Sequence, residues 1–118
     1  PQARTTFEAS FLDWDEAQSG EHAALLEFYR SLLALRRERY ALHRGYFTSI
    51  RVEVLAEGAI LMHRGNISVL ASRGDARVTW QAGLPVRVLA TFGEGSITED
   101  GTLTLDGAGA LVCERSDA

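Results

Sequence analysis

The 118 residues are enough for one domain and well short of the roughly 250 that an α/β barrel enzyme usually needs. With 46% hydrophobic residues, 24% charged residues and two prolines, the composition excludes wholesale disorder and collagen-like repeats. The formal net charge of −4 argues against a nucleic-acid binder, because that role needs a basic surface.

The chain shows no sign of membrane insertion or secretion. No apolar run approaches the roughly 20 residues of a membrane span, and the first residues lack the basic-then-apolar layout of a signal peptide. The sequence therefore predicts a cytoplasmic protein without membrane contact. The chain opens on Pro1, and its single methionine, Met62, lies in mid-chain. We therefore expect these residues to be a piece of a longer polypeptide.

Residues 1–19 are polar, with scattered large apolar side chains, and are predicted to be an irregular lead-in. A helix is predicted over residues 20–41. Ser19 is suited to its N-cap, and Glu21 places a negative charge in the first turn, where the helix dipole favours it.

The predicted helix carries an apolar arc that is roughly 160° wide at 100° per residue. Its members are Phe28, Leu32, Leu25, Tyr29, Leu33, Leu26 and Arg36. So wide an arc predicts a neighbour on each side of the helix, as in the outer ring of a barrel.

Beyond residue 45 the apolar period changes to two, which is typical of strands. The candidate strands are 50–54, 59–64, 67–72, 76–81, 86–92, 102–105 and 110–115. Turn chemistry separates them, including Gly93-Glu94-Gly95 and Asp106-Gly107. About seven strands without intervening helices predict a mainly β fold, an antiparallel β-sandwich over residues 42–118 preceded by one long amphipathic helix.

Few residues offer chemistry. Cys113 lies in an alternating strand, which indicates a buried and inert thiol. The histidines His22, His43 and His63 have no metal-ligand spacing, so we expect no metal and no cofactor. The acidic residues 13–16 lack the glycine and the distal glutamate of a calcium loop and are interpreted as a solvated lead-in to the helix.

Arg36 and three aromatic residues are the remaining candidates for a site. Arg36 lies near the middle of the apolar arc, where an unpaired charge would be costly. It is predicted to be a structural anchor that meets a carboxylate or backbone carbonyls, with contact to a ligand as the alternative. Trp80, Tyr46 and Phe47 could stack on sugar rings if one face exposes them, although packing is the more common fate of such residues.

Residues 1–42 resemble the segment that follows the last barrel strand in malto-oligosyltrehalose trehalohydrolases of the α-amylase superfamily. The resemblance is carried by Pro1-Gln2, Thr6-Phe7, Leu12-Asp13-Trp14, Gly20-Glu21-His22-Ala23 and Leu33-Ala34-Leu35-Arg36-Arg37. Residues 46–118 are similar in pattern to the C-terminal sandwich of such enzymes. The resemblance implies that residues 20–41 are the final helix of a (β/α)8 barrel, which would be the partner of this segment.

Members of that family hydrolyse the α-1,4 bond next to the terminal trehalose unit of maltooligosyl trehalose. Such retaining enzymes use a pair of carboxyl groups, which the family carries on earlier barrel strands. None of these maps onto this chain, so the resemblance implies a structural segment with no catalytic residue. Its excision should leave Leu25, Phe28 and Leu32 partly uncovered. A standalone carbohydrate-binding sandwich and the tail of a branching or debranching relative stay open as alternatives.

Overall fold

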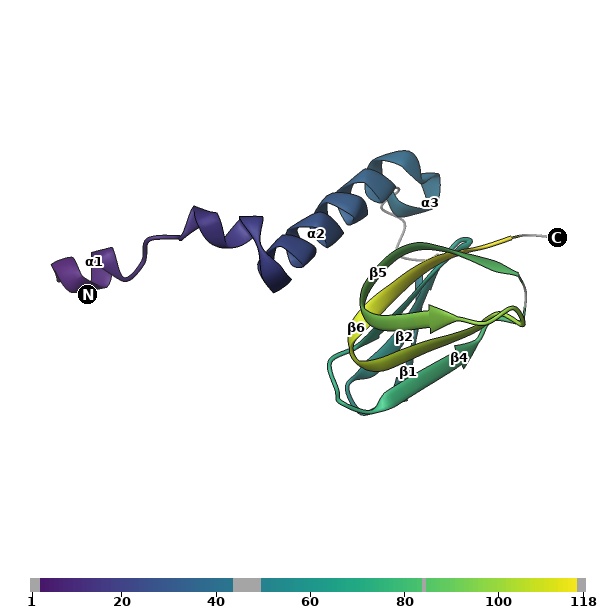
Figure 1. Ribbon diagram of the computed structural model, residues 1–118. Helices are drawn as coiled ribbons and strands as arrows, with labels where there is room; N and C mark the ends of the chain where they lie inside the picture. Colours follow the sequence, from purple (N-terminus) through teal and green to yellow (C-terminus); the bar gives the residue numbers. More distant parts are fainter. Residues whose placement is uncertain (1–2, 44–49, 84, 117–118) are drawn as a thin grey trace.

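The computed structural model describes residues 3–43, 50–83 and 85–116, in which a helical part precedes an antiparallel sheet (Figure 1). This order confirms the predicted mainly β fold with a preceding helix. The chain is elongated, with extents of 60 × 32 × 26 Å. Its radius of gyration is 17.3 Å, whereas a compact chain of this length has about 13.5 Å.

The helical part contains α1 (Arg4–Glu8), the 3-10 helix η1 (Trp14–Gln18), α2 (Gly20–Glu38) and α3 (Tyr40–His43). The predicted long helix is α2. It ends three residues earlier than expected because Arg39 has an extended backbone, with φ −97° and ψ 113°. Ser19 occupies the N-cap as predicted, but its side chain makes no capping hydrogen bond.

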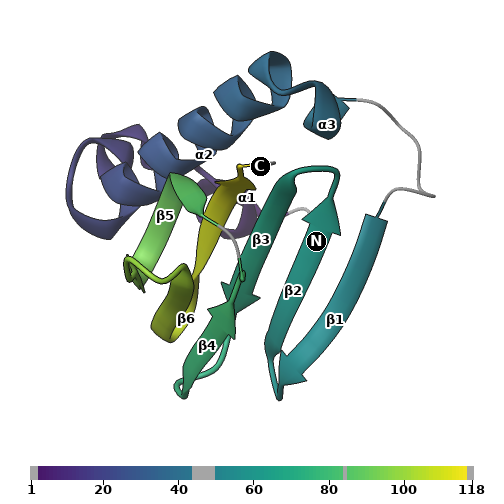
Figure 2. The same ribbon diagram turned by 90° about the vertical axis from the view of Figure 1, so that its right-hand side faces the viewer.

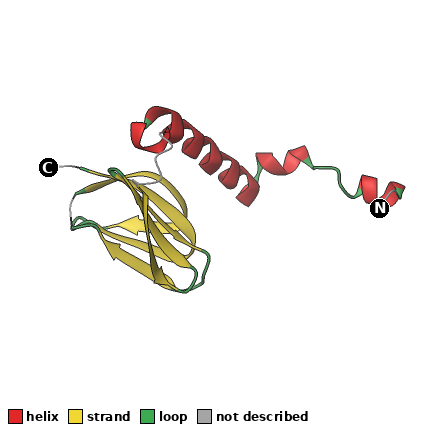
Figure 3. Cartoon of the chain, turned by 180° about the vertical axis from the view of Figure 1, so that it is seen from behind, coloured by secondary structure: helices red, strands yellow, loops and turns green. Residues whose placement is uncertain are grey.

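The strands are β1 (Ile50–Ala56), β2 (Ala59–Arg64), β3 (Ile67–Ser72), β4 (Arg77–Gln81), β5 (Val86–Ile97) and β6 (Thr102–Arg115). All pairings are antiparallel. One side of β6 pairs with β3 and β4 and the other with β5, so β6 is central (Figure 2). The sheet folds over on itself (Figure 3), and Val78 of β4 packs in one cluster with Leu61 of β2 and Leu70 of β3.

The described residues form six strands where the turn signals predict about seven. Asp106-Gly107 lies inside β6 and Gly93-Glu94-Gly95 inside β5, so both turn predictions are wrong. The physical reason is that Gly93 and Gly107, with φ of +80° and +83°, let two paired strands bend together without reversing the chain. Segments 102–105 and 110–115 are therefore the two halves of one strand.

Apolar side chains gather in two clusters on opposite faces of the sheet. The inner core lies between the folded-over parts of the sheet and contains Ala59, Leu61, Leu70, Val78, Leu103, Leu105, Leu111 and Cys113. The outer cluster joins α2 to the other face of the sheet and contains Leu35, Ile67, Ala90 and Val112. The sheet thus supplies one of the two neighbours that the wide apolar arc of α2 predicts.

Candidate functional site

The chemistry available in the described residues is limited. They hold no group of three or more His, Cys, Asp or Glu side chains that could bind a metal ion. Cys113 is fully buried, and burial raises the pKa of its thiol to about 11, which disfavours a nucleophilic thiolate. Within the described ranges, no helix is both long and apolar enough to cross a membrane.

His63 is the centre of a polar contact at the inner face of β2. Its Nδ1 lies 2.8 Å from Ser68 Oγ, and its Nε2 lies 3.6 Å from Glu53 Oε1. Burial lowers the pKa of His63, Arg115 and Arg51 lower it further, and Glu53 opposes them. Because Ser68 is fully buried, a substrate cannot reach its hydroxyl group. These groups therefore join neighbouring strands and do not form a nucleophilic site.

Of the three residues predicted to stack on sugar, the structure describes Trp80 alone. Trp80 on β4 is half-buried, packs against the inner core and has its ring centroid 5.4 Å from that of His63. Tyr46 and Phe47 lie outside the described residues. The sugar-stacking surface accordingly stays a prediction, with one of its three rings engaged in packing.

Two adjacent rows of apolar side chains run along α2. The row that packs toward the sheet consists of Phe28, Leu32 and Leu35. The second row, called here the exposed row, consists of Leu25, Tyr29 and Leu33, which are 40%, 58% and 52% exposed. Leu25 is uncovered as expected, whereas Phe28 and Leu32 turn toward the sheet. The described residues thus supply a neighbour for one side of the helix and leave the other open.

The exposed apolar surface continues from α2 onto the lead-in. Trp14 of η1 and Tyr29 of α2 line an open hollow between these two helices. Further along the lead-in, Phe7 and Phe11 are also exposed. The chain presents 8578 Å² of accessible surface, about 2,300 Å² more than the roughly 6,300 Å² of a compact monomer of 12.9 kDa. Exposed apolar side chains that gather in this way are typical of a surface that contacts another folded body.

Arg36 lies on the open side of α2. Its side chain is exposed, and no described residue forms a hydrogen bond or an ion pair with it. The anchoring role predicted for Arg36 would therefore need a partner from outside the described residues.

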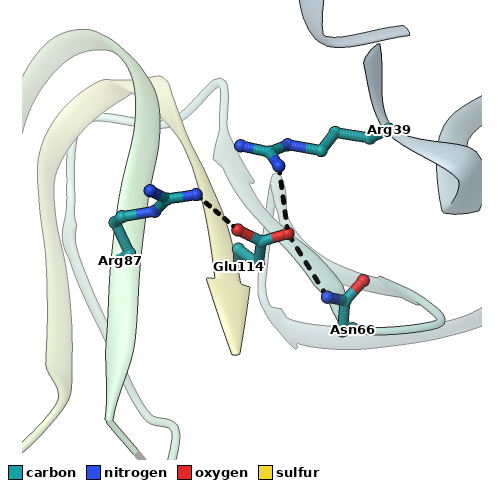
Figure 4. Close-up of polar contacts among 4 residues, drawn as sticks. All are labelled: Arg39, Asn66, Arg87 and Glu114. Carbon is teal, nitrogen blue, oxygen red and sulfur yellow. Dashed lines mark hydrogen bonds and ion pairs between the residues drawn. The ribbon is translucent and has the colours of Figure 1, made fainter. Parts of the chain in front are cut away.

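Arg39, and not Arg36, connects the end of α2 to the sheet (Figure 4). The Nη1 of Arg39, directly after the helix, lies 3.7 Å from Oε1 of Glu114 on β6. Asn66 Nδ2 donates a hydrogen bond to the same oxygen at 3.3 Å, and Arg87 Nη2 donates to Oε2 at 2.7 Å. These four residues, the Glu114 network, connect the end of α2, the β2–β3 turn and β5.

The surroundings of Glu114 favour its charged form. The hydrogen bond from Arg87, the nearby charge of Arg39 and the hydrogen bond from Asn66 hold the pKa of Glu114 below its usual range, while desolvation opposes them. The Glu114 side chain is 19% exposed and that of Arg39 is 31% exposed, so solvent screens their contact less than it screens the contact with Arg87, whose side chain is 63% exposed.

Sequence reasoning missed the Glu114 network because its members are distant in the chain. Arg87 and Glu114 are direct cross-strand partners, which only the register of β5 and β6 reveals. The available signal was a lone acidic residue at the end of an apolar strand, and it does not identify its partners.

We expect Glu114→Gln to lower the free energy of unfolding by about 1–3 kcal/mol at pH 7, because two arginines lose their charged acceptor. The lowered pKa means that Glu114 stabilises the fold above its unfolded pKa of about 4.3, and that this contribution is lost as pH falls through the folded pKa. Urea unfolding at pH values from 7 to 3 measures this contribution. As the pH is lowered, the free energy of unfolding should fall less in the variant than in the unsubstituted chain.

The matched control is Glu94→Gln, since Glu94 is exposed on β5. This change should alter the unfolding free energy by less than about 0.5 kcal/mol. Equal stability of the two variants at pH 7 would contradict a tertiary role for Glu114.

No family model matches the chain. The chain is 40% identical over 106 residues to the malto-oligosyltrehalose trehalohydrolase of Brevibacterium helvolum and 39% over 92 residues to that of Rhizobium sp. (strain M-11). It is 36% identical over 90 residues to the enzyme of the same name from Deinococcus radiodurans. These matches confirm the resemblance seen in residues 1–42. They cover 89%, 77% and 76% of this chain but only 18%, 15% and 14% of the relatives, so the chain spans less than a fifth of their length.

Proposed function

We propose that this chain, which is related to malto-oligosyltrehalose trehalohydrolases over most of its length, is the C-terminal portion of such a glycosidase. The observation that carries the proposal is an identity of 36–40% over 90–106 residues with enzymes several times longer. The parent enzyme would hydrolyse the α-1,4 bond next to the terminal trehalose unit of maltooligosyl trehalose and release trehalose.

The role of this segment in the parent is structural. Residues 1–19 would lead in from the barrel, residues 20–41, which contain α2, would supply its final helix, and residues 42–118 would form the C-terminal sandwich domain. The exposed row supports this division, because Leu25, Tyr29 and Leu33 would face the barrel while the sheet covers the other side of α2. Arg36 lies on the same open side and would meet a carboxylate or carbonyls of the barrel.

The catalytic carboxyl groups would lie outside this chain. Hydrolysis with retention needs two carboxyl groups about 5–5.5 Å apart. Barrel enzymes place such groups at the C-terminal ends of barrel strands. This segment would contribute the last helix of the outer ring of that barrel. The Glu114 network would connect the sandwich to this helix.

The test is a trehalose-release assay on the full-length parent. We expect trehalose from maltooligosyl trehalose, none from a maltooligosaccharide of equal length, and no product from the 118-residue chain alone. A parent that cleaves only α-1,6 branches would instead identify a debranching relative. If the polypeptide in its native cells has a mass near 12.9 kDa and binds maltooligosaccharides, the standalone sandwich would be favoured and the proposal refuted.

A further inference from the structure

The outer face of the sheet carries two rows of cross-strand neighbours. Directly paired residues of antiparallel strands project from the same face. From β5 to β1, the first row consists of Ala90, Val112, Val69, Met62 and Val52. The second row, from β6 to β1, consists of Ala110, Ala71, Ile60 and Val54. All nine side chains are apolar, so this face is continuous across the sheet.

Burial changes from one end of these rows to the other. Ala90 and Val112, which belong to the outer cluster beneath α2, are 9% and 4% exposed. At the β1–β2 end, Val52, Ile60 and Val54 are 54%, 43% and 78% exposed. One apolar surface is therefore covered by a helix at one end and open at the other.

The open end has room for one more helix. The five strands from β5 to β1, spaced about 4.8 Å apart, span about 19 Å, which is close to two helix diameters of about 10 Å. Since α2 packs on the β5 and β6 side, a neighbour 8–10 Å from its axis would be centred near β2, between β3 and β1. A shallow hollow lined by Val54, Ile60 and Ala71 could receive one of its side chains.

We propose that a second amphipathic helix of the same polypeptide packs beside α2 on this open surface and contacts Val52, Val54 and Ile60. The inference rests on the proposed function, because the helix would come from the part of the parent outside these 118 residues. The relatives leave more than four-fifths of their length for it. Continuity with the α2–sheet contact favours a helix as the occupant.

Strand addition by a second copy fits the open edge less well. The edge strand β1 carries an ion pair between Arg51 and Glu53, whose Nη2 and Oε1 are 2.6 Å apart. Its pairing with β2 also shifts register between Val54 and Ala56. Charged side chains and bulges are features that hinder edge-to-edge pairing.

The occupant can be identified by photo-crosslinking in the full-length parent, with benzoylphenylalanine placed at residue 54 or residue 60. We expect each to form an intramolecular crosslink to a helix that precedes residue 1. The matched control is residue 79, where Thr79 is exposed on β4, and we expect no such crosslink there. A covalent dimer, or no crosslink from either test position, would overturn the proposal.

A second measurement uses substitutions. Val54→Asp and Ile60→Asp in the full-length parent should each lower Tm by several degrees, because they would bury an unpaired carboxylate. Thr79→Asp should leave Tm unchanged, and equal Tm values for all three variants would overturn the proposal. Trehalose release is assayed on the unsubstituted parent: crosslinking without release would refute only the proposed function, and release without crosslinking would refute only the second helix.

Discussion

Gly93→Ala is expected to lower the free energy of unfolding by about 2–5 kcal/mol, because two separate costs coincide at this position. Gly93 has φ +80°, a conformation that costs an L-residue about 1–2 kcal/mol. A Cβ there would also lie 2.5 Å from the carbonyl oxygen of Ala108 on β6, so the paired backbones must move apart. The change therefore acts on the bend where the sheet folds over.

Two neighbouring glycines separate these costs. Gly107 has φ +83° but nothing within 4 Å of its Cβ position, so Gly107→Ala should cost only about 1–2 kcal/mol. A Cβ at Gly109 would clash with the Phe92 carbonyl oxygen without a positive φ, so Gly109→Ala isolates the steric cost at about 1–3 kcal/mol. Urea unfolding of the three variants measures each term. If Gly93→Ala lowered the free energy of unfolding no more than Gly107→Ala does, the result would contradict the close approach of β5 and β6 at Gly93.

Leu70→Ala is expected to lower the free energy of unfolding by about 2–5 kcal/mol. Leu70 is fully buried in the inner core, and its cross-strand partners Leu61 and Leu111 are also almost fully buried. Removing three carbon atoms from such a site costs their transfer free energy and leaves a cavity.

The matched control for this prediction keeps the volume. Leu70→Met should cost less than about 1.5 kcal/mol, because methionine can fill the same space. Equilibrium unfolding in urea, followed by circular dichroism, compares both variants with the parent sequence. A loss below about 0.5 kcal/mol for Leu70→Ala would show that the space between the folded-over parts of the sheet is not closely packed.

Turn chemistry was the least reliable sequence signal in this chain. An Asp-Gly pair is typical of a reversal, yet Asp106-Gly107 lies within a strand of 14 residues. A positive φ at glycine serves a tight turn and a bend within paired strands equally well. Which of the two forms depends on whether a partner strand continues alongside, and here β5 does so.

Arg36, the arginine predicted to anchor the helix, lies about one helical turn from Arg39, the arginine that pairs with Glu114. Arg36 falls within the apolar arc of the helix, but its side chain is exposed, while Arg39 approaches Glu114. Helical periodicity places a charge on a face without specifying what covers that face. The carboxylate that pairs with Arg39 belongs to Glu114 on β6, 75 residues further along the chain. Local sequence patterns do not predict contacts between residues so far apart in the chain.

The sequence by itself determined the features that depend on near neighbours in the chain: a long amphipathic helix, strands after it, and the relationship to the trehalohydrolases. Tertiary structure alone decided which apolar face became the core. Val52 and Val54 alternate with charged residues as a half-buried strand should, yet they lie on the open face, while Leu55 packs against the inner core. The physical reason is that a period of two makes one face apolar, whereas pairing with β2 and the neighbours on each side decide where that face points.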